Sequence, residues 1–258
     1  MPCSLDSLRA FLDDILRVRE FSDEPNALNG LQVDATAGAD QAAEIATVAL
    51  SVDAAEAVID EAIALKADLL LVHHGLFWGG LRPLVGSFGR KLRKCFGARL
   101  SVYSAHLPLD VHPTLGNNAC LARALDFPVA GPFGNYRGID VGLEVVCDVS
   151  PEELSALCAS VLGTEVRLYG KGPRRVRRLG IVSGGGGSCL KQAAAQGLDA
   201  MLTGESAHHT VIDAEEAGIY LLLGGHYRTE TFGVRALGDL IGAQFGIDVR
   251  FIGHDTGL

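Results

Sequence analysis

The sequence has no excess of positive charge and no long apolar run. Its 22 Lys and Arg residues are outnumbered by 31 Asp and Glu residues, which gives a formal net charge of −9. Nucleic acids and anionic membrane surfaces favour cationic partners, so this balance disfavours both.

No apolar stretch approaches the ~20 residues of a membrane-spanning helix. The start of the chain, with Asp6, Asp13 and Asp14, lacks the basic and then apolar form of a signal peptide. We therefore expect a cytoplasmic protein.

The sequence also lacks a paired cysteine motif. Its six cysteines are scattered, with no C-x-x-C. A chain of 258 residues with 48% hydrophobic content can bury a core without disulfides. The cysteines are therefore expected to be reduced thiols, several of them in apolar stretches. The fold is not expected to depend on a metal ion.

Apolar periodicity divides the first half of the chain into alternating helices and strands. We expect a helix that begins after Ser4 and ends before Pro25, a loop at residues 29–33, and buried strands at residues 45–52, 69–72 and 100–104. Asp53 and Glu56 have the spacing of a capping box and predict a helix between the first two of these strands. Residues 45–72 therefore form a β-α-β unit.

Proline and glycine residues at 128–134 predict a turn and a domain boundary. Beyond it, strands are expected at residues 141–147, 165–169, 179–182, 201–203, 219–223 and 249–252. Helices are expected after Ser150, after residues 184–187, near residues 209–217 and from about Thr229. This order fits two α/β layers, and we detect no internal repeat.

Histidine and carboxylate side chains recur just past the apolar strands. The three clusters are His73 with His74, His106 with Asp110, and His226 with Glu230. Ligands of α/β proteins gather beyond the carboxyl ends of sheet strands. Neutral imidazoles bind zinc, iron, nickel and related ions, and carboxylates can bridge two cations. The convergence predicts a metal site.

Two local questions remain open from the residues alone. Adjacent side chains at a strand end point apart, so His73 and His74 serve two different metals, or one metal if the strand has already become a loop. Pro108 disfavours an uninterrupted helix that carries both His106 and Asp110, and it favours a strand-to-helix loop.

Other polar features have weaker patterns. The glycines at 184–187 precede a helix and fit either an anion-binding loop, although no Lys-Ser/Thr follows as in a P-loop, or a flexible connection. His208 and His209 could serve as metal, substrate, capping or surface groups, and His112 fits a loop residue or a group that orients a ligand. A basic cluster fits the solvated flank of a strand or a contact for an anionic substrate; it comprises Lys171, Arg174, Arg175, Arg177 and Arg178.

Five motifs in one order carry a resemblance that spans nearly the whole chain. They are Asn29-Gly30-Leu31-Gln32, Leu71-Val72-His73-His74-Gly75, His106-Leu107-Pro108-Leu109-Asp110 with Gly116-Asn117-Asn118, Thr203-Gly204-Glu205 with His208-His209, and Gly225-His226-Tyr227-Arg228-Thr229-Glu230. Together they resemble the Nif-three-like family, whose members are often named GTP cyclohydrolase 1 type 2.

This resemblance implies a dinuclear metal centre in a ring-shaped homohexamer, built as a trimer of dimers. It also implies two α/β domains, the first (residues 1–127 plus 224–258) completed by the C-terminal segment around an inserted domain (residues 128–223). His106 matches a family histidine close to the metals and is a catalytic or accessory-ligand candidate. The implied metal ligands are His73, His74, Asp110, His226 and Glu230.

The leading functional hypothesis is a metal-dependent hydrolase. Two divalent ions, which could be iron, zinc, manganese or nickel, would lower the pKa of a shared water. The family name implies attack on the imidazole ring carbon of GTP. For nucleotide-like substrates, the residues allow both cyclic-amidine ring opening and phosphoester hydrolysis. The alternative is a metal-binding hexameric scaffold, metal-insertion factor or regulatory protein without turnover. A general acid or base, for which His106 or His209 is a candidate, would favour the enzyme. A third interpretation is a structural α/β protein whose histidines only satisfy hydrogen bonds.

Overall fold

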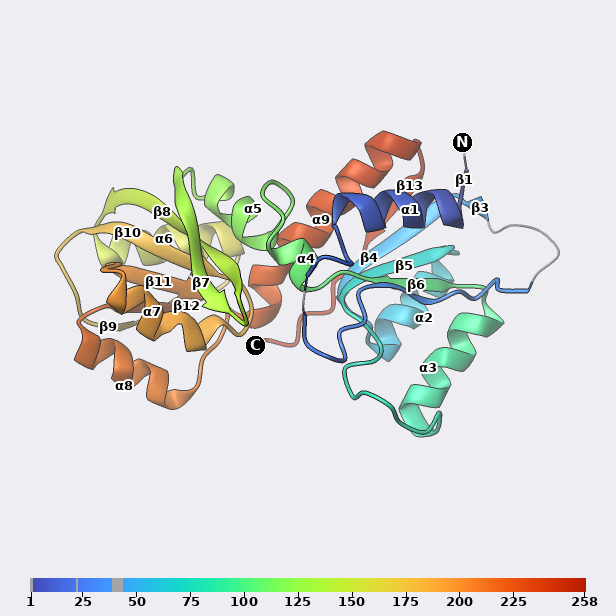
Figure 1. The fold of residues 1–258 in the computed structure, drawn as a ribbon, viewed down its shortest axis with the longest axis horizontal. Helices are drawn as coiled ribbons and strands as arrows, with labels where there is room; N and C mark the ends of the chain where they lie inside the picture. Colours follow the sequence, from blue (N-terminus) through green and yellow to red (C-terminus); the bar gives the residue numbers. More distant parts are fainter. Residues whose placement is uncertain (1, 22, 39–43) are drawn as a thin grey trace. The chain divides into compact units, whose positions relative to one another are not determined.

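The computed structural model describes residues 2–21, 23–38 and 44–258 of the chain (Figure 1). The chain divides into two compact units. Unit 1 comprises Met1–Leu109 and Val234–His254, and unit 2 comprises Asp110–Gly233 and Asp255–Leu258. The domain boundaries expected at residues 127/128 and 223/224 stay a prediction, because compactness alone does not show which segment folds independently.

Unit 1 is built on a five-stranded sheet with the order β13-β4-β5-β6-β2. Four strands are parallel, and β2 pairs antiparallel with β6. The strands are β13 (Asp248–Phe251), β4 (Thr47–Asp53), β5 (Leu69–His74), β6 (Ser101–Ser104) and β2 (Gly30–Val33), and a separate antiparallel pair is formed by β1 (Cys3–Ser4) and β3 (Glu44–Ile45). The helices are α1 (Leu5–Ile15), α2 (Glu56–Ala64), α3 (Gly86–Gly97) and the part of α9 (His226–Phe245) from Val234 onward.

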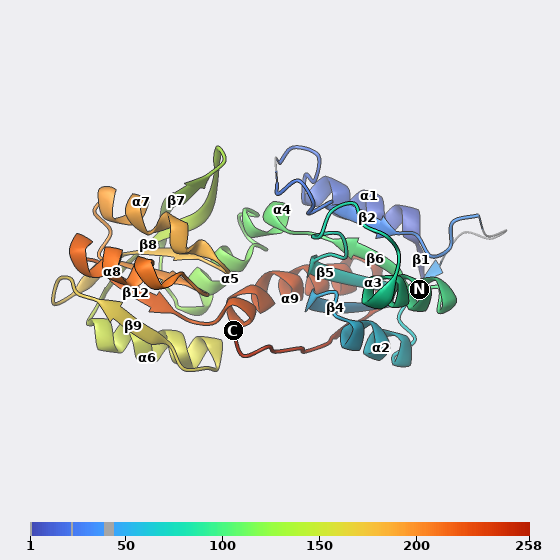
Figure 2. The ribbon, with the colours of Figure 1, turned by 90° about the horizontal axis from the view of Figure 1, so that it is seen from below.

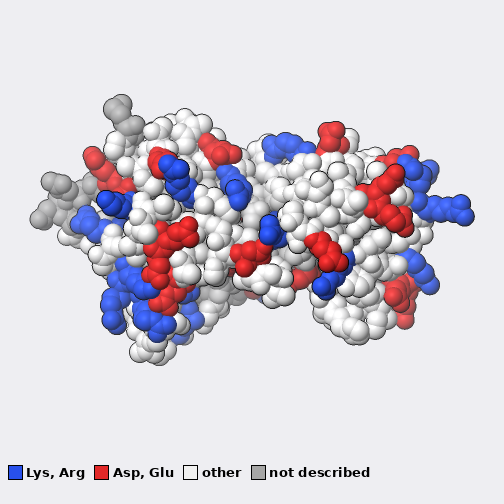
Figure 3. Space-filling view, turned by 180° about the vertical axis from the view of Figure 1, so that it is seen from behind, with Lys and Arg blue, Asp and Glu red and all other residues white. Residues whose placement is uncertain are grey.

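Helices cover both faces of this sheet, as expected for parallel strands such as β4, β5 and β6, whose residues are mostly buried (Figure 1). On one face, α1 and α9 meet where the rings of Phe11 and Phe245 lie 5.3 Å apart, edge to face. On the other, α2 and α3 are joined by ion pairs such as Glu56 with Arg90, at 3.0 Å. Figure 3 shows that positive and negative side chains are interspersed on one face of the molecule.

Unit 2 is built on a six-stranded sheet with the order β7-β8-β10-β11-β12-β9, in which β10, β11 and β12 are parallel. The strands are β7 (Val129–Tyr136), β8 (Ile139–Val149), β10 (Val176–Val182), β11 (Ala200–Thr203), β12 (Tyr220–Leu223) and β9 (Arg167–Gly170). The helical segments are α4 (Leu107–Asp110), which enters this unit at its last residue, α5 (Asn117–Ala124), α6 (Pro151–Leu162), the 3-10 turn η1 (Gly186–Cys189), α7 (Leu190–Ala195), α8 (His208–Ala217) and the start of α9. Figure 2 shows α6 and α7 on opposite faces of the sheet.

Several expectations are confirmed. Two α/β units, the first completed by Val234–His254, agree with the expected fold class. The Ser4 side chain accepts a hydrogen bond from the Ser7 amide at 3.1 Å and caps α1. Ser150 and Glu153 form a full capping box at the start of α6. No helix in the described ranges combines the length and the apolarity required to cross a membrane.

Other expectations are wrong for identifiable reasons. Helix α2 begins at Glu56 without a side-chain cap, because the Asp53 carboxylate contacts His74 instead. The expected loop at residues 29–33 contains strand β2. The expected turn at 128–134 is mostly β7, an edge strand that tolerates proline because one of its sides needs no ladder hydrogen bonds.

Two further differences concern the candidate ligands. Residues 107–110 form the short helix α4 rather than a loop, and Pro108 is compatible with it because the amide that proline lacks has no partner in a first helical turn. Helix α9 begins at His226 rather than near Thr229. His226 and Glu230 are therefore one helical turn apart on the same face.

Candidate metal-binding site

Three histidines converge at the carboxyl edge of the unit 1 sheet. His73 and His74 are the last residues of β5, and His106 lies two residues beyond the end of β6, the next parallel strand. One ring nitrogen from each of the three lies within 4.8 Å of the others. The strand continues through His74, yet the rings of His73 and His74 are only 4.8 Å apart, so both serve this one edge.

The Nδ1 atom of each ring is already held by an acceptor. His73 Nδ1 lies 2.8 Å from the Ala105 carbonyl oxygen. His74 Nδ1 lies 2.9 Å from Asp53 Oδ1, which the β4–β5 register places directly opposite. These acceptors favour the tautomer with a proton on Nδ1. The lone pair is then on Nε2, and an Nδ1 held in this way is the usual arrangement of metal-binding histidines.

His106 has the most elaborate support. Its Nδ1 lies 2.8 Å from Asp23 Oδ1, and its backbone amide donates to Asn29 Oδ1 at 2.7 Å. Asn29 Nδ2 donates in turn to Asp23 at 2.7 Å. Burial opposes ionisation of Asp23, but its hydrogen bonds to His106 and Asn29 outweigh this effect and lower the pKa of the carboxyl group. A carboxylate thus fixes the orientation of the His106 ring.

Gln32, the last residue of the first motif, shapes the chain after His74. Its Oε1 accepts the Leu76 amide at 2.7 Å and its Nε2 donates to the Ala27 carbonyl at 2.9 Å. A Cβ atom at Gly75 would lie 2.2 Å from Gln32 Nε2, so a larger residue there would displace the Gln32 amide. The Trp78 ring also lies beside the histidines, edge-on to the ring of His106 at 4.7 Å.

In unit 2, His226 and Glu230 form a second group. His226 Nε2 lies 3.2 Å from Glu230 Oε2, and His226 Nδ1 lies 2.8 Å from Glu205 Oε1. Contact with Glu230 and then Glu205 raises the pKa of His226 to about 9, against the opposing effect of burial. An imidazole between two carboxylates has a strong preference for a positive charge, which a metal ion at Nε2 could supply in place of the proton.

The glycine-rich loop after β10 is packed against this group. Gly184 has a φ of +61°, and a Cβ there would lie 2.1 Å from Glu230 Oε1. The Gly184 amide donates to Thr229 Oγ1 at 2.9 Å, and the Gly184 carbonyl accepts from Thr203 Oγ1 at 3.0 Å. These bonds tie the loop after β10 to the end of β11 and to the start of α9, so this loop is fixed in place rather than a loose connection.

Asp110 is nearly buried, at 9% exposed, and is oriented by its own partners. Its Oδ1 accepts from Asn117 Nδ2 at 2.8 Å and from Ser183 Oγ at 3.3 Å. The Asn117 side chain also accepts the Gly233 amide of α9 at 2.7 Å. The Gly116-Asn117-Asn118 motif therefore ties the Asp110 carboxylate to the loop after β10 and to α9.

Some residues singled out from the sequence lie in other surroundings. His112 accepts backbone amides of Thr114 and Leu115 through Nδ1, a local turn that fits the loop interpretation. Arg178 of the basic cluster pairs with Glu144 on the neighbouring strand at 2.7 Å. His209 is exposed at the start of α8 and lines a cavity of unit 2.

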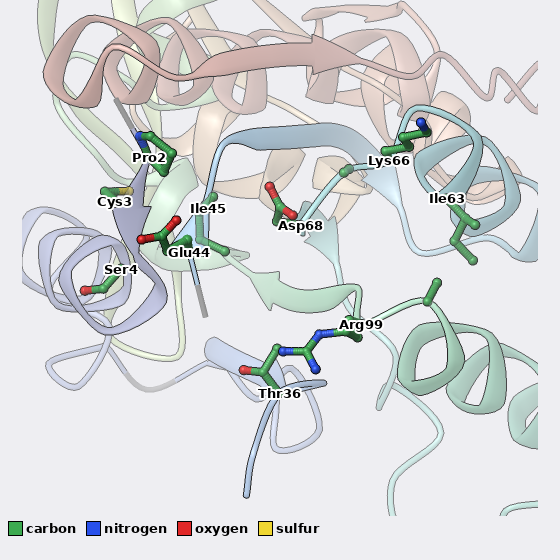
Figure 4. Close-up of a pocket in the computed structure, with 12 residues that line it drawn as sticks. Pro2, Cys3, Ser4, Thr36, Glu44, Ile45, Ile63, Lys66, Asp68 and Arg99 are labelled. Atoms are coloured by element: carbon green, nitrogen blue, oxygen red, sulfur yellow. The ribbon is translucent and has the colours of Figure 1, made fainter. Parts of the chain in front are cut away.

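A cavity in unit 1 does not belong to this chemistry. It measures about 890 Å³ and opens at the amino-terminal end of the parallel strands, the end opposite to the histidines (Figure 4). Asp68 lies at its centre but is occupied by the amides of Ala46 and Thr47, at 2.8 and 2.9 Å. None of the candidate ligands lines it.

Sequence reasoning missed the carboxylates that hold Nδ1. Asp23, Asp53 and Glu205 come from segments 21 to 83 residues away from the histidines they contact. No spacing rule connects such pairs. Glu205 alone carried a signal, because it lies in the Thr203-Gly204-Glu205 motif.

The fold and these side chains define an α/β protein with candidate His and Glu metal-binding groups, whose imidazole and carboxylate donors suit divalent transition-metal ions. The chain belongs to the Duf34/NIF3 (NGG1p interacting factor 3) family, which matches residues 3–257. The expected family is thereby confirmed.

Similar proteins agree with this assignment. A protein of Deinococcus radiodurans named "GTP cyclohydrolase 1 type 2 homolog" is 39% identical over 258 residues, which is 98% of this chain and 94% of that protein. The solved structure of protein ybgI, described as of unknown function, has a TM-score of 0.90 and 33% identity over 99% of this chain and 100% of its own. TTHA1606 from Thermus thermophilus has a TM-score of 0.85 and 34% identity, with 99% and 100% coverage.

Proposed function

We propose that the protein is a dinuclear metal-dependent hydrolase that acts on a nucleotide-type substrate. The observation that supports it most is shared by four histidines from two units: each has Nδ1 held by a carboxylate or a carbonyl, which fixes the orientation of the ring as in metal-binding histidines. The proposed ligands of the two divalent ions are His73, His74, Asp110, His226 and Glu230.

Bound divalent ions would supply Lewis acidity and an acidified water near neutral pH. The chain's own groups would then manage protons and orientation. Asp23 holds the His106 ring with Nδ1 protonated, so that Nε2 can accept a proton and later return it. We assign His106 this general acid and base role, and the five ligands the task of holding the ions.

GTP is the first substrate to test, because relatives carry the name GTP cyclohydrolase 1 type 2 homolog. The reaction would be hydrolytic opening of the imidazole ring of guanine. The homohexamer and the cytoplasmic location expected from the sequence stay predictions. The identity of the metal among iron, zinc, manganese and nickel also stays open to experiment.

The test is GTP turnover by protein loaded with each of these metals in turn, with products identified by mass spectrometry. His106→Asn should keep its metal and lose about 10²- to 10⁴-fold in turnover, the usual loss for a general acid or base. His112→Asn is the matched control and should retain activity, because that side chain only accepts backbone amides in a local turn.

The possible outcomes separate the hypotheses. Metal-dependent ring opening that falls in His106→Asn supports the enzyme. Metal bound at full level with no turnover of GTP or other nucleotides would contradict it and favour the metal-binding scaffold or regulatory role. A protein that binds no metal would contradict both.

A further inference from the structure

A second cavity, in unit 2, borders the His226 and Glu230 group. It measures about 630 Å³ and is bounded by the glycine-rich loop after β10, the loop after β11 and the first turn of α8. Glu205 is part of its wall and also hydrogen-bonds His226 Nδ1 at 2.8 Å. The cavity therefore adjoins a candidate metal ligand through one shared side chain.

Two hydroxyl groups in the cavity wall are left without protein partners. Thr210 is only 4% exposed and lines the cavity, and its hydroxyl makes no hydrogen bond within the described part of the chain. Ser206 Oγ is buried and likewise has no partner among the described residues. An unsatisfied buried hydroxyl is costly, so the Ser206 hydroxyl is informative. Both can donate to a ligand in the cavity.

The same wall carries further groups that can bind an anion. Helix α8 is 10 residues long and begins beside the cavity. Its N-cap residue, Ala207, provides no side-chain cap, and its first turn has no acidic residue. An uncapped helix start with free amides attracts anions. Lys191 and His209, which also line the cavity, add donors from two different elements.

The two carboxylates of the wall are already engaged. Glu205 accepts from His226, and Asp213 pairs with Lys191 at 3.4 Å. Gly187 lets the glycine-rich loop approach closely, since a Cβ there would lie 2.7 Å from Ser206 Cβ and 3.6 Å from Thr210 Oγ1. The glycine thus keeps open the space in front of the two hydroxyl groups.

We propose that this cavity is a phosphate subsite, in which Thr210, Ser206 and the start of α8 bind the oxygens of a phosphate group and Lys191 and His209 complete it. The assignment of this phosphate to the substrate rests on the proposed hydrolase function. The binding of phosphate at the cavity does not depend on that function. A cavity that offers donors from hydroxyl groups, backbone amides and a lysine suits a phosphate better than a neutral sugar.

The test is calorimetric titration of the full-length protein with inorganic phosphate, as purified and after treatment with a chelator. Thr210→Val keeps the side-chain shape, removes the hydroxyl and should weaken phosphate binding about tenfold, the effect of one charge-assisted hydrogen bond. Lys191→Gln should weaken it about threefold, as expected for an exposed charge. The matched controls are Thr164→Val and Lys171→Gln, which lie outside the cavity and should bind as the wild type does.

The chelator distinguishes this proposal from the proposed function. Phosphate binding that persists without metal and falls in Thr210→Val supports the subsite, even if the protein proves to have no hydrolase activity. Phosphate binding that disappears with the metal would place phosphate on the ions and overturn the subsite. Equal binding by wild type and Thr210→Val, or no saturable binding at all, would also overturn it. GMP binding more tightly than guanosine, with the difference lost in Thr210→Val, would assign the phosphate to a nucleotide.

Discussion

At the scale of single residues, the candidate chemistry depends on how each imidazole is turned. The Nδ1 atoms of His74, His106 and His226 each form a hydrogen bond with a carboxylate, and His73 Nδ1 forms one with a backbone carbonyl. A carboxylate at Nδ1 raises the basicity of Nε2 and fixes the ring, which strengthens metal binding. The acceptors are therefore as important to the proposed site as the ligands.

His226 should make metal affinity depend on pH. Its pKa is raised to about 9, so below that pH a metal must displace a proton from the imidazole. Metal affinity is expected to rise up to about tenfold per pH unit from pH 7 to 9 and then level off. Without metal, the stabilisation from the charged His226 is complete below the ordinary pKa of 6.5 and is lost as the pH rises through about 9.

Calorimetric titration of the protein with a divalent metal ion at a series of pH values measures this dependence. Glu205→Gln removes one of the two carboxylates that raise the pKa of His226. The variant should reach its maximal metal affinity at a lower pH than the wild type. An affinity that does not change with pH in the wild type would contradict the role of His226 as a ligand.

The carboxylate ligands can be tested separately. Asp110→Ala and Glu230→Ala should each lower the metal content while the secondary structure, measured by circular dichroism, is retained. The expectation follows because both residues lie at loop or helix ends and not in the apolar core clusters. A full metal complement in both variants would mean that neither is a ligand.

At the scale of elements, the candidate residues lie at the same kind of position, the carboxyl ends of parallel strands. In unit 1, β4, β5 and β6 lead to Asp53, His74 and His106. In unit 2, β10, β11 and β12 lead to Gly184, which packs against Glu230, to Glu205 and to His226. Parallel strands bring their carboxyl ends to one edge, so remote segments meet without any local sequence signal.

In the loop after β10, Gly184 is the position at which we expect a substitution to affect stability and metal affinity most. Gly184→Ala would place a methyl group 2.1 Å from Glu230 Oε1 in a backbone conformation with a φ of +61°. The left-handed conformation alone costs about 1–2 kcal/mol for an L residue. We expect a lower melting temperature and a weakened metal affinity. Gly185→Ala is the matched control, because its φ is −85° and no atom lies within 4 Å of the added Cβ. Equal behaviour of the two variants would contradict the proposed packing of this loop against Glu230.

Much of this layout could be predicted from the sequence, because β4 and β5 contain apolar runs, and histidines follow closely at the ends of β5 and β6. Strand β2 was missed because it is four residues long and starts with Gly30 at a φ of +106°. Strand β7 was missed because its glycines and proline resemble a turn. The capping-box spacing of Asp53 and Glu56 was misleading, since a tertiary contact with His74 outweighed the local cap. Local patterns do not encode such contacts.

At the scale of the whole molecule, each unit has its own apolar core, and neither core cluster contains a candidate ligand. Metal removal by a chelator should therefore lower the melting temperature, since a ligand that binds only the native state stabilises it, but should leave a cooperative unfolding transition. Differential scanning calorimetry would measure both. A chain that loses its transition without metal would contradict this expectation.

His209 lies in the cavity wall of unit 2 rather than in a metal-binding group. His209→Gln should leave the metal content unchanged and affect only substrate or phosphate binding. Elemental analysis of the variant beside the wild type would decide this. Loss of metal in His209→Gln would enlarge the ligand set and weaken the phosphate-subsite assignment.

The central claim is that the converging histidines bind metal. The most direct test is elemental analysis of the purified protein, wild type beside His74→Ala, with His112→Ala as the control histidine. The account predicts about two metal ions per chain, as in other two-metal sites, in the wild type and in His112→Ala, and a clear loss in His74→Ala. A wild type without metal, or a full complement in His74→Ala, would contradict it.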